Sequence, residues 1–206
     1  MADPAAIHPP TRELILTAAL YRFSEQGYAG TSLNDIADDV GIRRPSLLHH
    51  FPSKEALYRA VLRMLIGDWL TLVQEAAEGP EKGWPKVERM LLAAFRFFES
   101  HPEFVRLARR EAIDGGPFLG EEVAAALQPL FEQAAAFLER EMRANRLRRH
   151  NPRQLIITGY GAILSYFSDA PLITALIGSD PGSERPLRER RRHIIELFRD
   201  ALEPKL

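Results

Sequence analysis

The chain has 206 residues, of which 46% are hydrophobic and 27% are charged, and its formal net charge at pH 7 is −1. This length and composition are enough to bury a hydrophobic core, and they exclude a disordered or fibrous protein. The chain contains no cysteine, which excludes a disulfide framework, a thiol nucleophile and a cysteine-based zinc site, and which fits a reducing cytoplasm.

Two stretches bear on the location of the protein. The first residues, MADPAAIHPP, lack the charged segment and apolar core of a signal peptide, so we expect a short flexible arm over residues 1–10. The most apolar run, LIITGYGAILSYF at 155–167, has 13 residues, fewer than the roughly 20 that a membrane-spanning helix needs. We therefore predict a cytoplasmic protein with no membrane span.

Helical periodicity runs through nearly the whole chain, and no run alternates strictly with a period of two. The sequence therefore predicts an all-α fold of about nine helices. Pro129 is expected to kink or split the seventh of them. Prolines, glycines and capping residues bound the predicted helices, which cover residues 11–26, 31–40, 44–51, 53–78, 85–99, 102–114, 118–144, 152–168 and 186–202.

Residues 31–54 are typical of a helix-turn-helix unit. Two short helices are joined by a tight turn at Gly41 and Ile42, and such a unit places its second helix in the major groove of DNA. Leu47 and Phe51 lie four residues apart, on one face of the second of these helices. We expect that face to pack inward, which leaves the other side chains of the helix to contact DNA.

The residue types in this unit suit contacts with DNA. Arginine can bind guanine through two hydrogen bonds, serine can reach a phosphate or a base edge, and proline can contact a thymine methyl group. Hydroxyl and backbone N–H groups at the start of a helix suit a phosphate. The candidate DNA-contacting residues are Thr31, Ser32, Arg43, Arg44, Pro45, Ser46, His49, His50 and Lys54.

Other interpretations of these residues stay open. The two arginines could be solvated surface charges, and Thr31 and Ser32 could serve only as helix caps. Adjacent helical residues diverge by about 100°, so His49 and His50 cannot hold one metal ion, and we predict no metal site. No nucleophile motif, phosphate loop or pair of catalytic carboxylates stands out, so we expect neither an enzyme nor a cofactor.

The run from Thr11 to Leu57 resembles the N-terminal DNA-binding domain of the tetracycline-repressor (TetR) family of bacterial transcriptional regulators. The likeness is densest in the passage His-Phe-Pro-Ser-Lys-Glu-Ala-Leu, residues 50–57, which joins the third and fourth helices. One position differs, because the family usually has a tyrosine that touches the DNA backbone where this chain has Leu48. The resemblance covers about a quarter of the chain strongly.

The resemblance implies a ligand-responsive transcriptional regulator, expected to be a repressor, that binds a palindromic double-stranded DNA operator as a homodimer. It implies a DNA-binding domain at 11–56 and a ligand-binding and dimerisation domain at 57–206, bridged by the fourth helix. The alternative is a helical protein-interaction module that never binds DNA, for which the net charge of −1 is the best argument.

The C-terminal half is rich in aromatic residues, most of which we expect in the core. Phe98, Phe104 and Tyr160 are our candidates for the wall of a cavity that binds a small, partly apolar ligand. By the resemblance, the apolar run 155–167 and the last helix pair with their symmetry mates in a four-helix bundle; the alternative is that they close the core of a monomer. The candidate interface residues are Gly159, Ala162, Ile163, Tyr166, Ile194 and Phe198.

Overall fold

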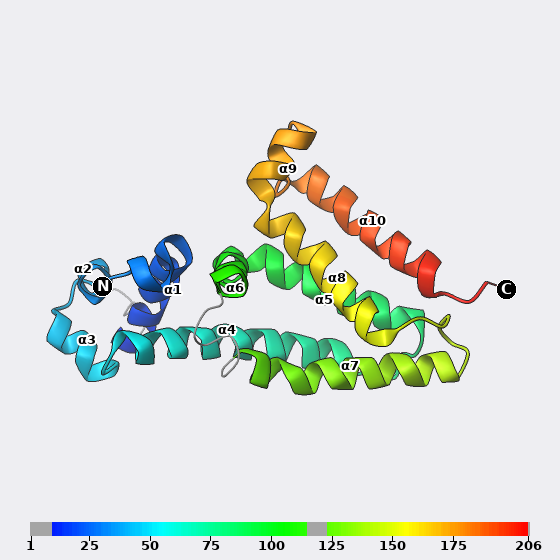
Figure 1. The fold of residues 1–206 in the computed structure, drawn as a ribbon, viewed down its shortest axis with the longest axis horizontal. Coiled ribbons are helices and arrows are strands. Elements are labelled where there is room, and N and C mark those ends of the chain that lie inside the picture. Colours follow the sequence, from blue (N-terminus) through cyan, green and yellow to red (C-terminus); the bar gives the residue numbers. More distant parts are fainter. Residues whose placement is uncertain (1–9, 115–122, 206) are drawn as a thin grey trace, which may run out of the picture. The chain divides into compact units, whose positions relative to one another are not determined.

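The computed structural model describes residues 10–114 and 123–205. These residues form ten helices and no strand (Figure 1), which confirms the all-α prediction. The expected start of the helix at 118–144 and nearly all of the expected arm at 1–10 lie outside the described residues. The chain divides into two compact units, 1–64 and 65–206, and the division falls within one helix.

The first unit holds α1 (Thr11–Gly30), α2 (Leu33–Val40), α3 (Arg44–His50) and the first part of α4 (Lys54–Ala77). α1 packs against α2, and α2 packs against α3. Each of the four helices contributes large side chains to one core because apolar residues recur along one of its faces. The fully buried core residues of this unit include Ile15, Phe23, Ile36, Leu47, Leu57, Tyr58 and Val61.

Local signals in the sequence set the ends of these short helices. Gly27 interrupts α1 with φ 72°, and Gly41 ends α2 in the left-handed region with φ 72° and ψ 30°. The Ser32 hydroxyl caps α2 by accepting a hydrogen bond from the Asn34 N–H at 3.1 Å. Pro45 lies in the first turn of α3, where its missing N–H has no intrahelical partner. Each of these ends follows the sequence prediction.

The second unit holds the rest of α4, α5 (Trp84–Ser100), α6 (Pro102–Asp114), α7 (Ala125–Arg143), α8 (Pro152–Ser168), α9 (Ala170–Ile177) and α10 (Glu184–Leu202). α8 is its central helix, because it packs against α5, α6, α7 and α9. Gly159 permits a close approach, since a Cβ atom there would lie 3.5 Å from Cζ of Phe198 and 3.7 Å from Cδ2 of Leu91. Pro129 lies inside α7 without splitting it.

An aromatic cluster fills part of the core of this unit. The ring of Trp69 stacks on Phe98 with centroids 5.5 Å apart and meets Phe97 edge-on at 4.9 Å. Phe104 also meets Phe97 edge-on, at 4.9 Å. Stacked and edge-to-face pairs of this kind add to the energy of area burial. These ring pairs hold the end of α5 and the start of α6 against the second half of α4.

The sequence did not predict α9. It follows α8 after Asp169 alone, and none of its residues is buried. Leu172 and Leu176 are 60% and 75% exposed. No single described helix is long and apolar enough to cross a membrane; α8 and α9 reach that length only together, across a bend of 77°.

A buried carboxylate joins three segments of the second unit. Glu141, near the end of α7, accepts the Gly83 N–H at 2.9 Å and two guanidinium bonds from Arg146 at 2.6 and 2.9 Å. Its side chain is 3% exposed. The Arg146 hydrogen bonds, aided by the Gly83 N–H, lower the pKa of Glu141 from 4.5 to about 2 in spite of its burial.

We predict that Glu141→Gln lowers the free energy of unfolding by about 2 kcal/mol, a value reduced because Arg146 is partly exposed. The contribution of Glu141 is complete above its ordinary pKa of 4.5 and is lost as the pH falls toward 2, because the pKa is lower in the folded chain. Urea unfolding curves between pH 3 and 7 measure it. Glu139→Gln, which removes an exposed carboxylate on the same helix, is the control and should change stability by less than about 0.5 kcal/mol. Equal effects of the two substitutions would contradict the assignment.

Candidate DNA-binding face and ligand cavity

α3 presents one buried face and one exposed face. Leu47 and Phe51 are buried, at 0% and 3% exposure, as the sequence predicted. Arg43, Arg44, Pro45, Ser46 and His49 are exposed, and His50 and Leu48 are half-buried. These exposed side chains therefore lie together on one short helix and its N-cap.

The two arginines of this face are free to bind a partner. Neither the guanidinium group of Arg43 nor that of Arg44 forms an ion pair or hydrogen bond with another described residue. Both lie at the N-terminal end of α3, the end from which a helix-turn-helix unit contacts base edges. Exposure without an ion pair fits both interpretations of these arginines, as contacts to DNA and as solvated surface charges.

Thr31 has a different place from the one predicted. Its side chain is buried, at 4% exposure, and its hydroxyl lies 2.8 Å from the Gly27 carbonyl and 3.2 Å from the Arg22 carbonyl. The hydroxyl closes the irregular end of α1 instead of facing outward. We correct the prediction accordingly: Thr31 positions the start of α2, and its hydroxyl is not available to a phosphate. The half-buried Ser32 caps α2.

Lys54, the last predicted contact, is partly engaged within the unit. Its ammonium group lies 4.6 Å from the ring centroid of Tyr28 and donates to the Ala29 carbonyl at 3.3 Å. Desolvation lowers the pKa of Lys54. An ammonium group has three donors, so this contact holds the start of α4 against the end of α1 and leaves donors for a phosphate.

An ion pair that the sequence analysis missed holds α2 against α1. Arg22 donates to both carboxylate oxygens of Asp39 at 2.6 Å. These hydrogen bonds raise the pKa of Arg22 and lower that of Asp39. Arg22 and Asp39 are 17 positions apart, and no local sequence pattern shows that two such distant residues pair. The sequence therefore did not predict this ion pair.

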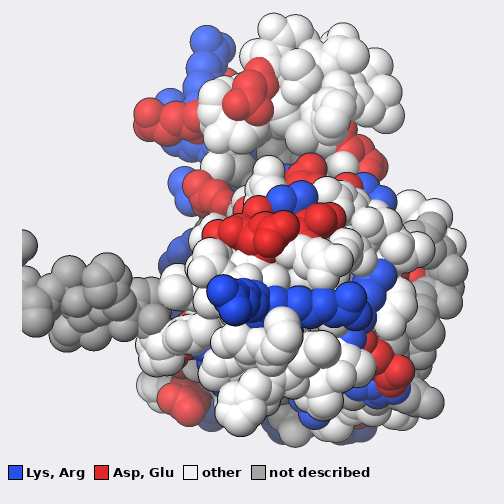
Figure 2. Space-filling model, turned by 90° about the vertical axis from the view of Figure 1, so that its left-hand side faces the viewer, with Lys and Arg blue, Asp and Glu red and all other residues white. Residues whose placement is uncertain are grey.

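Charge is unevenly spread on the side of the molecule where α2 and α3 lie. Figure 2 shows Lys and Arg side chains in a band across this side, with Asp and Glu side chains gathered beside the band. A net charge near zero for the whole chain is thus compatible with a local basic surface, which is what DNA binding requires.

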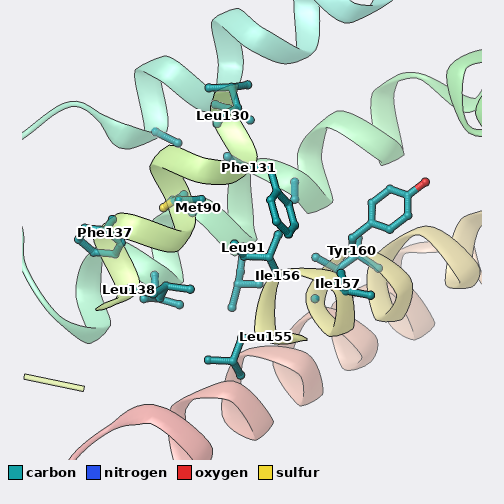
Figure 3. A pocket seen from close by; sticks show the side chains of 18 of the residues that line it. Met90, Leu91, Leu130, Phe131, Phe137, Leu138, Leu155, Ile156, Ile157 and Tyr160 are labelled. Carbon is teal, nitrogen blue, oxygen red and sulfur yellow. The ribbon is translucent and has the colours of Figure 1, made fainter. Parts of the chain in front are cut away.

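The second unit contains a cavity of about 390 Å³ between α4, α5, α7, α8 and α10. Its wall is almost entirely hydrocarbon (Figure 3), and none of the residues that line it carries a charge. A charged group inside the cavity would have no partner there, so its burial would cost much free energy. The cavity therefore suits an apolar molecule or the apolar part of one. The lining includes Trp69, Val73, Met90, Leu91, Phe98, Leu130, Phe131, Ala134, Phe137, Leu138, Ile156, Ile157, Tyr160 and Phe198.

Two of the three predicted ligand residues line this cavity. Phe98 does so from α5, and Tyr160 from α8, where it is 49% exposed. In Figure 3 the Tyr160 hydroxyl points away from Leu91, Phe131 and Phe137. Phe104 is not part of the lining: its ring stacks on Phe98 at 6.2 Å and supports that side chain from α6. We correct its role to that of a neighbour of the wall.

Most of the wall was missed by sequence reasoning. Trp69, Phe131 and Phe137 are aromatic residues at helical spacing, and the same spacing is typical of core residues. Whether such a residue faces a neighbour or an empty volume depends on how the helices pack, and no local signal distinguishes the two cases.

The predicted interface residues lie mostly inside the chain. Ile163, Ile194, Phe198 and Tyr166 are 1% to 7% exposed, and the Tyr166 hydroxyl donates to the Pro181 carbonyl at 2.9 Å. Gly159 is also buried, and Ala162 is half-buried. Burial within one protomer leaves little of these five side chains or backbones for a partner to contact, so only the half-buried Ala162 stays a candidate from the predicted set. α8 is apolar all round, so the sequence could not tell its inner face from its outer face.

The same two helices have a second, exposed apolar face. Ile157 on α8 and Leu197 on α10 are each 52% exposed. Gly161 of α8 is exposed, and a Cβ atom there would meet nothing within 4 Å. We call the exposed apolar positions Ile157, Gly161 and Leu197 the outer apolar face of α8 and α10, and they are further candidates for an interface. Among the described residues, no group of three or more His, Asp or Glu could hold a metal ion.

Known proteins of similar sequence and fold agree with this geometry. The HTH-type transcriptional regulator RutR of Escherichia coli K12 is 29% identical over 196 residues, 94% of this chain and 91% of that protein. The ketosteroid transcriptional regulator KstR2 of Mycobacterium tuberculosis is 18% identical and has a TM-score of 0.72 over 98% of this chain and 99% of that one. FadR of Bacillus subtilis, solved with stearoyl-CoA, is 14% identical, with a TM-score of 0.70 over 90% and 96% of the two chains.

Two family models match the two units. The model of bacterial regulatory proteins of the tetR family matches residues 15–61, which include α2 and α3. The model of the tetracyclin repressor-like C-terminal domain matches residues 85–198, more than half of the chain. The chain belongs to the TetR family of bacterial transcriptional regulators.

Proposed function

We propose that this chain represses transcription by binding a palindromic operator as a homodimer, and that an apolar small molecule in the cavity releases it. The observation that carries the proposal is the exposed face of α3, where Arg43 and Arg44 form no ion pair within the described part of the chain while Leu47 fixes the helix to the core. The chain is a ligand-responsive, DNA-binding regulator, and it would act in the cytoplasm.

The proposed contacts divide by chemistry. Arg44 would bind guanine through two hydrogen bonds, with Arg43 beside it, and Pro45 would contact a thymine methyl group. Ser46, His49 and His50 would reach base edges or phosphates. Ser32 and Lys54, at the starts of α2 and α4, would contact phosphates and fix the orientation of α3. These residues remain proposals.

The ligand could act through α4, which runs through both units. Its first part contributes Leu57 and Val61 to the core of the first unit, and its second part contributes Trp69, Val73 and Ala76 to the cavity wall. Two recognition helices must lie about 34 Å apart to enter successive major grooves. A ligand that prefers a different spacing would shift the population away from DNA, by no more than its differential affinity.

The cavity wall restricts the class of ligand. A hydrocarbon wall and a volume of about 390 Å³ favour a molecule with a large apolar part. One structural neighbour is a ketosteroid transcriptional regulator, and another was solved with stearoyl-CoA. A steroid and a stearoyl chain are both largely apolar. We propose an apolar chain or ring system as the portion that enters the cavity.

The dimer would form through the outer apolar face of α8 and α10. Ile157 and Leu197 are large and exposed there, and Gly161 lets a partner helix approach closely. A two-fold interface uses the same patch on both subunits, so the exposed apolar side chains of each subunit would be buried against those of its partner. The rival hypothesis is an interaction module that never binds DNA.

Arg44→Ala separates these two hypotheses. We expect the affinity for operator fragments selected from genomic DNA to fall by about 10- to 100-fold, because a bidentate contact with guanine contributes about 1–3 kcal/mol. Fluorescence anisotropy at fixed salt measures it. Arg96→Ala, which removes an exposed charge from α5, should leave the affinity unchanged. If no palindromic fragment is selected by the native protein, the proposed repressor function is wrong.

Ala134→Trp should fill part of the cavity, because Ala134 lines it from α7. We expect the neutral fluorescent probe N-phenyl-1-naphthylamine to bind the native chain and to bind this variant at least about tenfold more weakly. Operator affinity should be retained. Ala136→Trp places the same ring on the exposed side of the same helix and serves as the control; equal probe binding by both variants would show that the cavity is not the site.

Leu197→Glu should convert the dimer to a monomer, because a carboxylate would be buried without a partner in a two-fold interface. Light scattering during size-exclusion chromatography measures the mass. Ile113→Glu replaces an isoleucine of α6 that is 73% exposed and should leave the dimer intact. A dimer that survives Leu197→Glu would place the interface on another face.

A further inference from the structure

We propose that the ligand carries an anionic head beside its apolar chain, and that Lys86 and Arg140 hold this head at the Phe137 end of the cavity. The inference rests on the proposed function, because it assumes that the apolar chain lies in the cavity. It adds to the apolar cavity a second, positively charged site that binds an anion.

One ring of the cavity wall holds two cations beside it. The Lys86 ammonium and the Arg140 guanidinium each lie 5.6 Å from the ring centroid of Phe137, whose side chain lines the cavity. Lys86 comes from α5 and Arg140 from α7. Cations that rest on an aromatic face are held in a preferred position. Two positive charges therefore flank the same wall residue from two different helices.

Of these two cations, Arg140 forms a long ion pair with Glu141, which Arg146 binds more closely. At this end of the second unit, Glu81 pairs with Arg89 at 3.0 Å and Glu139 with Arg143 at 3.8 Å. Glu141 is taken by Arg146 at 2.6 Å and lies 3.8 Å from Arg140. Of the described residues, none forms an ion pair with Lys86, whose ammonium group has only the Gly79 carbonyl at 3.5 Å.

Two other arginines on the helices around the cavity have partners of their own. Arg153 of α8 pairs with Glu132 at 2.7 Å, and Arg199 of α10 pairs with Glu88 at 3.2 Å. Phe137 and Tyr160 lie at opposite sides of the cavity in Figure 3. Lys86 and Arg140 thus place positive charge at the Phe137 end, away from the Tyr160 phenol.

The chemistry of the two side chains defines the head. An apolar cavity cannot accept a charge without a large desolvation cost, so the head of an amphiphile must remain at the rim. A guanidinium group binds a carboxylate or phosphate through two parallel hydrogen bonds, and an ammonium group adds a point charge. The side chain of Arg140 is 62% exposed, so an anion can reach it from solvent. The ligand class is an anionic amphiphile.

The test compares three probes that share one chain: dodecanoyl-CoA, whose head carries phosphates; dodecanoate, whose head is a carboxylate; and 1-dodecanol, which is neutral. Binding to the full-length dimer is followed by tryptophan fluorescence, to which Trp69 in the cavity wall and Trp84 contribute. We expect the native chain to bind at least one anionic probe at least about tenfold more tightly than 1-dodecanol, with an affinity that falls as salt is added. The better of the two anions identifies the head as phosphate or carboxylate.

Lys86→Gln combined with Arg140→Gln should remove this preference and leave binding of 1-dodecanol unchanged. Arg96→Gln combined with Lys205→Gln removes the same charge from exposed positions outside the cavity lining and should keep the preference. Urea unfolding of both double variants establishes that each is folded. If 1-dodecanol binds as tightly as both anions, or if the Lys86 and Arg140 variant keeps the preference, the head site is wrong while the cavity stands. If none of the probes binds, the apolar cavity itself fails as a ligand site.

Discussion

The dual role of α4 is the constraint on which the rest of this protein depends. A single helix buries Leu57 and Val61 in the core of the first unit and Trp69 in the cavity wall of the second. The two units are therefore joined through one continuous helix. A change in the packing around Trp69 acts on the same helix that carries Leu57 and Val61 into the core of the first unit.

The cavity can be viewed as an incomplete core. Its walls are the apolar faces of the surrounding helices, and Gly159 in the wall lets Phe198 of α10 lie close to α8. An unfilled apolar volume forfeits dispersion contacts, so the unliganded chain gives up stability there. A molecule that fills the volume restores those contacts and stabilises the state that it fits best. The dispersion contacts that the cavity wall lacks are thus the contacts that a bound ligand would provide.

Local signals made most helices of both units predictable, but in the second unit they did not show which helix faces are buried. Ser32, Gly41 and Pro45 act within one turn of helix, so the ends of α2 and α3 followed from the sequence. Leu47 and Phe51 could be assigned to the core because α3 has only one apolar face. Thr31 was misassigned, since its hydroxyl bonds carbonyl groups made accessible by the irregular Gly27. In α8, apolar residues on every face gave no way to tell the buried Ile163 from Ile157, which is 52% exposed, so the predicted interface set included residues that are buried within the protomer.

Leu48 lacks the hydroxyl group that the family usually has at this position of α3, which affects the roles of the neighbouring residues. It is half-buried on α3, between the buried Leu47 and the exposed His49. A leucine cannot donate to a phosphate, so any backbone contact that relatives make through a tyrosine hydroxyl here has to come from another donor or be absent. His49 is the adjacent exposed donor, and its ring lies 5.7 Å from that of His50. Burial of Leu48 against the core would in turn hold α3 more firmly, because apolar contact replaces a polar group at the margin of the unit. In this chain the recognition helix would therefore be fixed more by packing and less by the phosphate backbone.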